Sequence, residues 1–319
     1  MKQLMLGNKA VARGLYEAGC AVVSSYPGTP STEVTEEAAK YDEMYCEWAP
    51  NEKVAMEVAF GACLAGKRSF CGMKHVGLNV AADPLFTVSY TGVNAGMVIV
   101  VADDAGMHSS QNEQDSRHHA IASKIPMLEP SDSAEARAFT MRAFELSEQF
   151  DTPVIIKMCT RVAHSQSIVE PGERVEPPVK PYEKNIGKYV MMPGNAKKRH
   201  PIVEQRTRDL IAFAENCEFN RIEWGDTSIG IIASSTCYQY AKEVFGEKAS
   251  ILKLGMINPL PEKLILDFAA KVDKLVVIEE LDPIIENHCK QLGLTVTGKD
   301  VLPIEDEFSQ NLIAEKLGM

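Results

Sequence analysis

The stretch GMVIVVAD, residues 96–103, is apolar from Met97 to Ala102 and ends in an aspartate. A strand with one face in water would alternate apolar and polar residues, so this run predicts a strand that helices cover on both faces. Shorter β-branched or apolar runs occur at 20–26, 43–48, 68–73, 125–130 and 153–158. Helix-like segments separate them, at 8–19, 30–40, 51–66, 77–86 and 132–150. This alternation predicts an α/β fold with a doubly wound, mostly parallel sheet.

The composition changes after this region. Residues 169–201 hold six prolines and three glycines among many charges, which predicts an extended connector across a surface. A polar helical stretch follows at 202–219, and a smaller α/β unit begins at 228–235. We therefore expect three parts: a first domain at 1–165, a linker with a helix at 166–225, and a second domain at 226–319.

Charge and cysteine content limit the possible partners. The 33 basic and 44 acidic residues give a net charge of −11, which disfavours nucleic acid as a partner. Apolar runs stay far below the roughly 20 residues that span a bilayer, so we expect no membrane partner and a cytoplasmic location. The eight cysteines form no C-x-x-C pair, which indicates buried thiols in a reducing compartment rather than a cysteine-bound metal.

Ligands of open parallel sheets collect beyond the carboxyl ends of the strands, and YPGTPS (26–31) is such a strand-to-helix loop. Its prolines and glycine fix a rigid turn, Ser31 or Thr32 can cap the next helix, and Thr29 is left free to point a hydroxyl into the crevice. A rigid capped turn without a ligand explains the same residues.

Two further loops carry candidate groups. The helix entered through Pro50 and Asn51 has Glu52 in its first turn, either as a functional carboxylate or as a complement to the helix dipole. Lys74 and His75 end a strand before Gly77 and Asn79 open a helix. The polar stretch 102–119 holds three histidines but no recognised metal-ligand spacing, and its hydroxyls and amides also suit substrate positioning.

Taken in order, the segments YPGTPS, NEKVAMEVAFGACLAG, MKHVGLNVAADPL, VADDAGMHSSQNEQDSR, IPMLEPSD and RVAHS closely resemble one family. This is the α subunit of indolepyruvate ferredoxin oxidoreductase, in the thiamine-diphosphate-dependent 2-oxoacid:ferredoxin oxidoreductase superfamily. The resemblance covers residues 1 to about 165, the family's N-terminal, aminopyrimidine-binding domain. Residues 226–308 look like its transketolase-C-terminal-like domain.

The resemblance implies a role for each candidate residue. Glu52 would contact N1′ of the aminopyrimidine and so promote removal of the thiazolium proton, the step that starts oxidative decarboxylation of a 2-oxo acid to an acyl-CoA. Cofactor contacts would come from Pro27, Gly28, Gly77, Leu78 and Asn79. Substrate contacts would come from Thr29, His75, Ser109 and Arg161.

Two departures qualify the resemblance. Asp103 and Asp104 stand where pyruvate-type relatives carry a substrate-binding arginine, which favours an aryl pyruvate, although Arg161 could supply the charge. The only Gly-Asp pair, Gly225 and Asp226, leads into a predicted strand, and Asn258 lies in an Asn-Pro turn, so we do not expect this set to bind a diphosphate through magnesium.

The chain therefore contains half of a thiamine diphosphate site and no metal ligands of its own. Mg²⁺ and [4Fe-4S] clusters are expected in a further domain or a partner chain that binds the diphosphate, and the enzyme is expected to be active only with that partner. The resemblance implies an oligomer that includes a β subunit and uses ferredoxin, CoA and a 2-oxo acid. Two alternatives stay open: a non-catalytic assembly or binding subunit of such a complex, and a metal hydrolase built on the histidines of 108–119.

Overall fold

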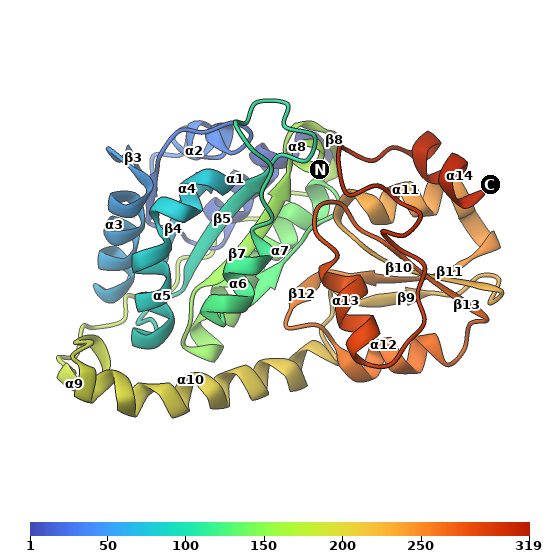
Figure 1. The fold of residues 1–319 in the computed structure, drawn as a ribbon. Helices are drawn as coiled ribbons and strands as arrows, with labels where there is room; N and C mark the ends of the chain where they lie inside the picture. The colour runs from blue at the N-terminus through green and yellow to red at the C-terminus, as the bar shows by residue number, and fades with distance from the viewer.

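The computed structural model describes residues 1–319, which form two α/β units side by side (Figure 1). The N-terminal unit is built on a seven-stranded sheet with the order β12-β6-β7-β5-β4-β2-β3. In that order the strands are Met256–Asn258, Met127–Leu128, Val154–Cys159, Met97–Asp103, Ser69–Lys74, Val22–Ser25 and Tyr45–Trp48. All run parallel except β12, which pairs antiparallel with β6.

Helices cover both faces of this sheet, as the unbroken apolar run of β5 predicts. Val98, Val100 and Ala102 pack in the core under one set of helices: α1 (Gly7–Glu17), α2 (Thr32–Ala38) and α7 (Ser133–Phe150). Met97, Ile99 and Val101 point to the other face, under α3 (Glu52–Leu64), α4 (His75–Val80), α5 (Ala82–Thr91) and α6 (Arg117–Ser123). The doubly wound, mostly parallel α/β fold is confirmed.

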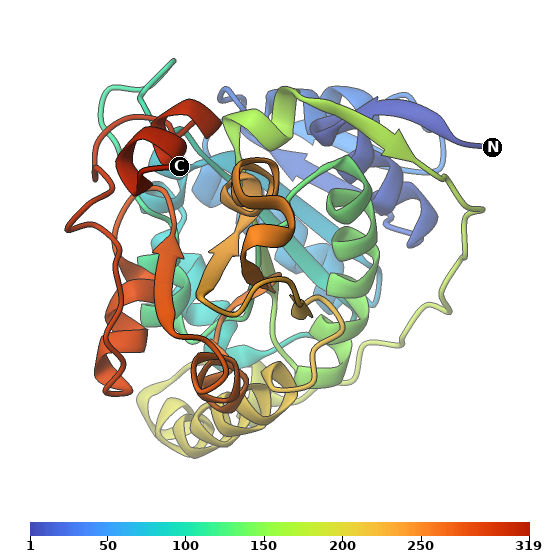
Figure 2. The same ribbon diagram turned by 90° about the vertical axis from the view of Figure 1, so that its right-hand side faces the viewer.

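The C-terminal unit is built on a four-stranded sheet with the order β13-β10-β11-β9. These strands are Lys274–Ile278, Ile229–Ser234, Ser250–Leu254 and Arg221–Glu223, and β9 alone is antiparallel. One face packs against α11 (Ser235–Phe245) and α14 (Gln310–Leu317), with the short 3-10 turn Gly246–Lys248 between α11 and β11. The other face, with α12 (Glu262–Ala269) and α13 (Ile284–Gln291), shares a hydrophobic core with the N-terminal unit. Figure 2 views the molecule with the C-terminal unit in front of the N-terminal one.

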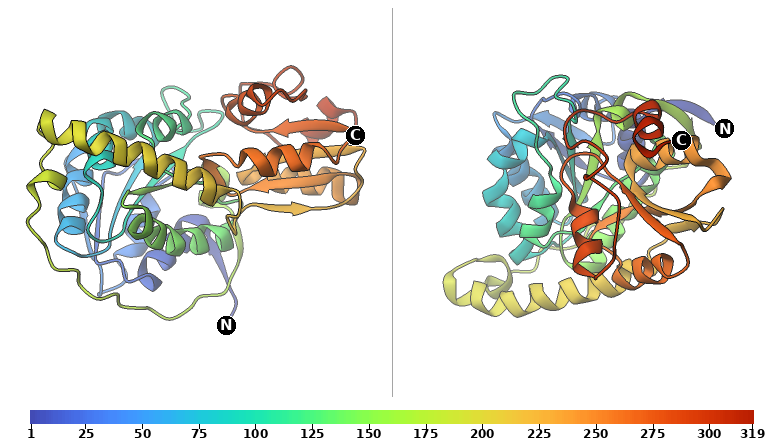
Figure 3. Two further views of the ribbon diagram at one scale, coloured as in Figure 1. Left: turned by 90° about the horizontal axis from the view of Figure 1, so that it is seen from below. Right: turned by 45° about the vertical axis from the view of Figure 1, so that its right-hand side comes forward.

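The connector between the units differs in part from the sequence prediction. β1 (Gln3–Leu6), a stretch for which no strand is predicted above, pairs antiparallel with β8 (Gln166–Val169). An extended segment then runs as an arc along the outside of the N-terminal unit to α9 (Ile186–Tyr189), as Figure 3 shows. The next helix, α10, spans Pro193–Ala214 and so begins inside the stretch that was expected to be extended.

Tertiary contacts explain how α10 tolerates Pro201 in its interior. Arg199 and Arg206 are buried and donate hydrogen bonds to the last backbone carbonyls of α5, those of Ser89, Tyr90 and Thr91. These carbonyls have no partner within their own helix, so the two arginines satisfy them and hold α10 in place. No helix of the chain is both long and apolar enough to cross a lipid bilayer.

Candidate functional site

The loops that carry the candidate residues meet at one edge of the large sheet, where its six parallel strands end. The loop after β2 contains Thr29, and the segment after β3 contains Glu52. His75 follows β4, while Arg161, in α8 (Thr160–His164), follows β7. Because strands β3, β2 and β4 are neighbours, the first three of these residues belong to one half of the edge and Arg161 to the other.

Glu52 lies at the start of α3, as the sequence predicts. Asn51 caps this helix, because its side chain accepts a hydrogen bond of 3.0 Å from the backbone N–H of Val54. The Glu52 side chain is almost buried, with the residue 9% exposed. No hydrogen bond or ion pair within the chain reaches its carboxylate, and its place in the first turn of α3 suits an acid that complements the helix dipole.

Gly77 provides the space that the Glu52 side chain occupies. A Cβ atom on Gly77 would lie 2.4 Å from Oε1 of Glu52 and 2.6 Å from its Cγ, which is closer than real contacts allow. Any other residue at 77 would therefore push the carboxylate away. By contrast, a Cβ on Gly61, in the middle of α3, would meet no atom within 4 Å.

The polar loop, defined here as residues 104–116, is tied to the helix that begins with His75. Lys74 donates from Nζ to the Ser109 carbonyl at 2.5 Å, and Asn79 donates to the Gln114 side chain at 2.9 Å. Burial lowers the pKa of Lys74, although the nearby Asp104 opposes this shift. Three residues of the motif MKHVGLN, His75 among them, thus hold the loop over the first turn of α4.

His75 is 1% exposed, and its Nε2 lies 3.2 Å from the carbonyl oxygen of Asn112. A carbonyl can only accept a hydrogen bond, so Nε2 carries the proton and Nδ1 of the neutral ring is an acceptor. Nδ1 is buried and has no partner in the chain. An unpartnered buried acceptor is costly, and a donor from a ligand would satisfy it.

Asp103 and Asp104 are both used inside the chain. Asp104 accepts from Ser109 N–H, Ser110 Oγ and Thr160 Oγ1 at 2.8, 2.5 and 2.8 Å. Burial opposes the charge on Asp104, but these hydrogen bonds outweigh it and lower its pKa. Burial raises the pKa of Asp103, whose carboxylate accepts from Ser116 and lies 3.7 Å from Nζ of Lys157.

The loop after β2 leaves Thr29 and Pro27 exposed, and a Thr29 hydroxyl that points into the crevice stays a prediction. The prediction that Ser31 or Thr32 caps α2 is wrong: Ser31 donates to the Gly28 carbonyl at 2.8 Å, and Thr32 accepts from Gly28 N–H at 2.9 Å. Both hydroxyls therefore bond to the backbone of Gly28 and stiffen the turn rather than cap the helix. Leu78 is fully buried, whereas Asn79 is exposed.

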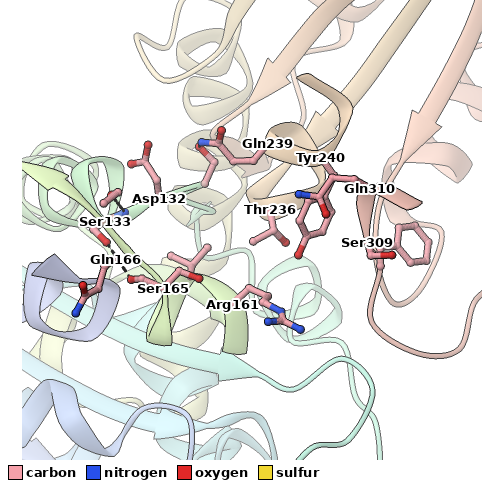
Figure 4. Close-up of a pocket in the computed structure, with 14 residues that line it drawn as sticks. Asp132, Ser133, Arg161, Ser165, Gln166, Thr236, Gln239, Tyr240, Ser309 and Gln310 are labelled. Carbon is pink, nitrogen blue, oxygen red and sulfur yellow. Dashed lines mark hydrogen bonds between the residues drawn. The ribbon is translucent and has the colours of Figure 1, made fainter. Parts of the chain in front are cut away.

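Arg161 lies apart from the residues around Glu52. It lines a cavity of about 500 Å³ between the two units, whose walls are mostly polar (Figure 4). Its Nε and Nη2 donate to the two carboxylate oxygens of Glu307, at 2.6 Å each. The guanidinium is thus committed to a carboxylate of the C-terminal unit, and Arg161 as a substrate contact stays a prediction.

The groups that suggested a metal do not come together. His108 pairs with Glu307 at 3.3 Å and His118 with Asp282 at 2.7 Å. No group of three or more His, Cys, Asp or Glu side chains is placed to hold a metal ion. Asp226 accepts from the backbone of Ser228, and Asn258 donates to the carbonyl of Ile125, so these two residues serve separate turns.

Sequence reasoning missed a buried ion cluster between the units. Arg117 is 2% exposed and donates to Asp115 at 2.6 Å and to Glu279, in the C-terminal unit, at 2.5 Å. Burial opposes the charge on Arg117, but the two carboxylates outweigh it and raise its pKa. Close by, Lys157 donates to Glu129 at 2.6 Å. Nothing in the local pattern around Arg117 shows that it is buried, because Glu279, its partner in the C-terminal unit, is 162 residues away.

Comparisons with known proteins match this architecture. The profile of the family described as "Pyruvate flavodoxin/ferredoxin oxidoreductase, thiamine diP-bdg" matches residues 13–214. The indolepyruvate oxidoreductase subunit IorA of Archaeoglobus fulgidus is 41% identical over 343 aligned residues, covering 100% of this chain and 54% of the relative. This chain thus spans about half the length of this relative and of the IorA subunit of Methanothermobacter thermautotrophicus strain Delta H, which it also matches.

Two solved structures share the fold. The 2-oxoglutarate:ferredoxin oxidoreductase of Magnetococcus marinus, solved with 2-oxoglutarate, coenzyme A and succinyl-CoA bound, superposes with a TM-score of 0.81 at 19% identity. The match covers 99% of this chain and 65% of that one. A split-gene transketolase, described as an inactive beta4 tetramer, gives a TM-score of 0.61 at 15% identity, with 98% and 97% covered.

Proposed function

The chain belongs to the pyruvate flavodoxin/ferredoxin oxidoreductase family of thiamine diphosphate-binding proteins, and from this premise we propose that it supplies the aminopyrimidine side of a 2-oxoacid:ferredoxin oxidoreductase active site. The names of its relatives support indolepyruvate as the type of 2-oxo acid. The complete enzyme would oxidise the acid to an acyl-CoA and pass the electrons to ferredoxin. A diphosphate-binding domain with Mg²⁺ and iron-sulfur clusters would come from sequence outside this chain or from a partner such as the β subunit.

The observation that carries this proposal is the state of Glu52. Its carboxylate is almost buried, has no partner, and lies in a recess that exists because residue 77 has no side chain. A carboxylate in such a place is unfavourable unless something donates a hydrogen bond to it or protonates it. The protonated N1′ side of an aminopyrimidine is a group of that kind, so the residues present fit the cofactor.

The surrounding residues suit the same ligand. The backbone of Pro27 and Gly28 on one side and of Gly77 to Asn79 on the other would hold the pyrimidine ring. Thiamine diphosphate, when bound, supplies the nucleophilic carbon that decarboxylation of a 2-oxo acid requires. Glu52 would hold a proton at the pyrimidine nitrogen, where a carboxyl within hydrogen-bond reach can exchange it.

Three other residues would act on the substrate. Thr29 has an exposed hydroxyl that can donate to the carboxylate of the 2-oxo acid. His75 offers its unpartnered Nδ1 as an acceptor. Ser109, in the polar loop, is exposed beside Lys74, and its hydroxyl would donate to the substrate there.

Replacing Glu52 by glutamine in the complete enzyme tests the proposal. The amide keeps the shape of the side chain but cannot exchange the proton, so we expect turnover to fall roughly 10²- to 10⁴-fold. Assembly and the melting temperature should not change. Glu57→Gln, at an exposed position of the same helix, removes the same charge and should leave turnover as it is.

Thiamine diphosphate binding, measured by calorimetry on the same proteins, separates the alternatives. We expect Glu52→Gln to bind the cofactor several-fold more weakly and still to assemble. Full turnover in this variant would overturn the catalytic assignment and leave the non-catalytic assembly role as the better account.

A further inference from the structure

The polar loop, residues 104–116, is held from two sides by different parts of the chain. On the side of the proposed cofactor site, Lys74, His75 and Asn79 bind it at Ser109, Asn112 and Gln114, as described above. Within the loop, Gly106 N–H donates to the Glu113 carboxylate at 2.7 Å. The Asp104 carboxylate accepts hydrogen bonds from Ser109 and Ser110. The loop contains no helix or strand, so its position depends on these contacts.

The C-terminal unit holds the other side of the loop. Nε2 of His108 lies 3.3 Å from a carboxylate oxygen of Glu307, and a Cβ on Gly106 would lie 3.2 Å from the backbone nitrogen of Glu307. At the far end of the loop, Asp115 accepts from the backbone N–H of Asp282 at 3.3 Å. The loop therefore lies between α4 and the C-terminal unit and touches both.

Glu307 is itself fixed in place. Both of its carboxylate oxygens accept from Arg161 at 2.6 Å, in the paired geometry that gives guanidinium–carboxylate contacts their directional specificity. The Glu307 side chain is 12% exposed, whereas those of His108 and Arg161 are 50% and 56% exposed. Glu307 is thus a partly buried point of attachment between two more exposed groups of the N-terminal unit.

We propose that the C-terminal unit positions the polar loop over the proposed cofactor site, and that Glu307 is the positioning residue through which it does so. Glu307 touches neither the cofactor nor the substrate; it acts through His108 on the loop and through Arg161 on the end of β7. Naming what the loop covers rests on the proposed function, but the contact between loop and C-terminal unit does not. The proposal gives the second domain of this chain a task in binding the 2-oxo acid.

The test compares Glu307→Ala with Glu305→Ala in the complete enzyme. Glu305 is exposed on the same segment and makes no hydrogen bond or ion pair, so it controls for loss of one negative charge. The first readout is amide hydrogen exchange of residues 104–116, followed by mass spectrometry without cofactor or substrate. We expect exchange in the loop to become about five- to tenfold faster in Glu307→Ala, since the loop loses its side-chain contact between His108 and Glu307.

The second readout is steady-state kinetics with the 2-oxo acid. A loop that is less well placed should raise KM about tenfold and change kcat less, because misplacing a positioning group weakens binding first. His108→Ala attacks the same contact from the loop and should give the same exchange pattern, with no added effect in the double variant.

Unchanged exchange in residues 104–116 of both Glu307→Ala and His108→Ala would overturn the proposal. So would equal acceleration in Glu305→Ala, which would assign the effect to charge alone. Because exchange is measured without the cofactor, this outcome is independent of the Glu52→Gln result. Faster exchange together with full turnover of Glu52→Gln would keep the contact and reject the proposed function.

Discussion

The two halves of the carboxyl edge of the large sheet differ in how their charged groups are satisfied. In the half formed by β5, β7 and β6, the ions Arg117 and Lys157 are buried, and carboxylates pair with both. In the half formed by β3, β2 and β4, Glu52 is almost as buried and has no partner, and Nδ1 of His75 lacks one as well.

Topology alone does not distinguish these halves, because both consist of parallel strands that end in loops. The difference lies in what the C-terminal unit covers: it supplies Glu279 and Glu307 to one half and nothing to the other. A covered half with paired charges acts as a joint between units. An open half with unpaired polar groups is what a bound cofactor and a second protein surface would complete.

Substitution of Arg117 tests most directly whether paired charges stabilise the covered half. Arg117→Ala leaves Asp115 and Glu279 buried without their cation, so we expect a loss of about 3–5 kcal/mol in the free energy of unfolding. Urea denaturation followed by circular dichroism measures it. Arg208→Ala, at an exposed site on α10, is the control and should change stability by less than about 0.5 kcal/mol. A loss below about 1 kcal/mol at Arg117 would show that the joint depends on packing rather than on this ion.

The open half can be tested without removing a charge. Gly77→Ala forces the Glu52 carboxylate out of its recess, so we expect cofactor affinity and turnover of the complete enzyme to fall about 10- to 100-fold, with a stability loss of about 1–3 kcal/mol from overpacking. Gly61→Ala lies on the same helix as Glu52 in open space and should be neutral or more stable by up to about 1 kcal/mol. Equal effects of the two substitutions would mean that the recess does not matter.

Local patterns predicted the strands and the start of α3, but neither the cap of α2 nor the buried ion pairs of the covered half. The strand runs and the Asn51 cap are written in neighbouring residues, so the sheet and the placement of Glu52 followed from sequence. The pairing of Arg117 with Glu279 joins residues 162 positions apart, and no local pattern encodes it. The start of α10 at Pro193 was missed for a similar reason, because Arg199 and Arg206 bind a distant helix end.

Glu280 allows a finer test of the covered half, since burial disfavours the charged form of its carboxyl group. Burial raises the pKa of Glu280 to about 7, although the Phe308 N–H donates to it and Lys157 lies nearby. The unfolded chain releases this proton near pH 4.5, so the folded state loses stability as the pH rises from about 4.5 to 7 and no further above that. Glu280→Gln keeps the acceptor for the Phe308 N–H and removes the titration. The free energy of unfolding of this variant should match that of the wild type near pH 5 and exceed it by about 1 kcal/mol at pH 8. This figure is reduced because the Glu280 side chain is partly exposed. Urea denaturation at both pH values measures this difference in unfolding free energy. Contributions from the histidines cancel in the difference because both proteins contain them. A difference in unfolding free energy that does not change with pH would mean that Glu280 is already ionised at pH 5. The carboxylates of the covered half would then keep their charges throughout this range.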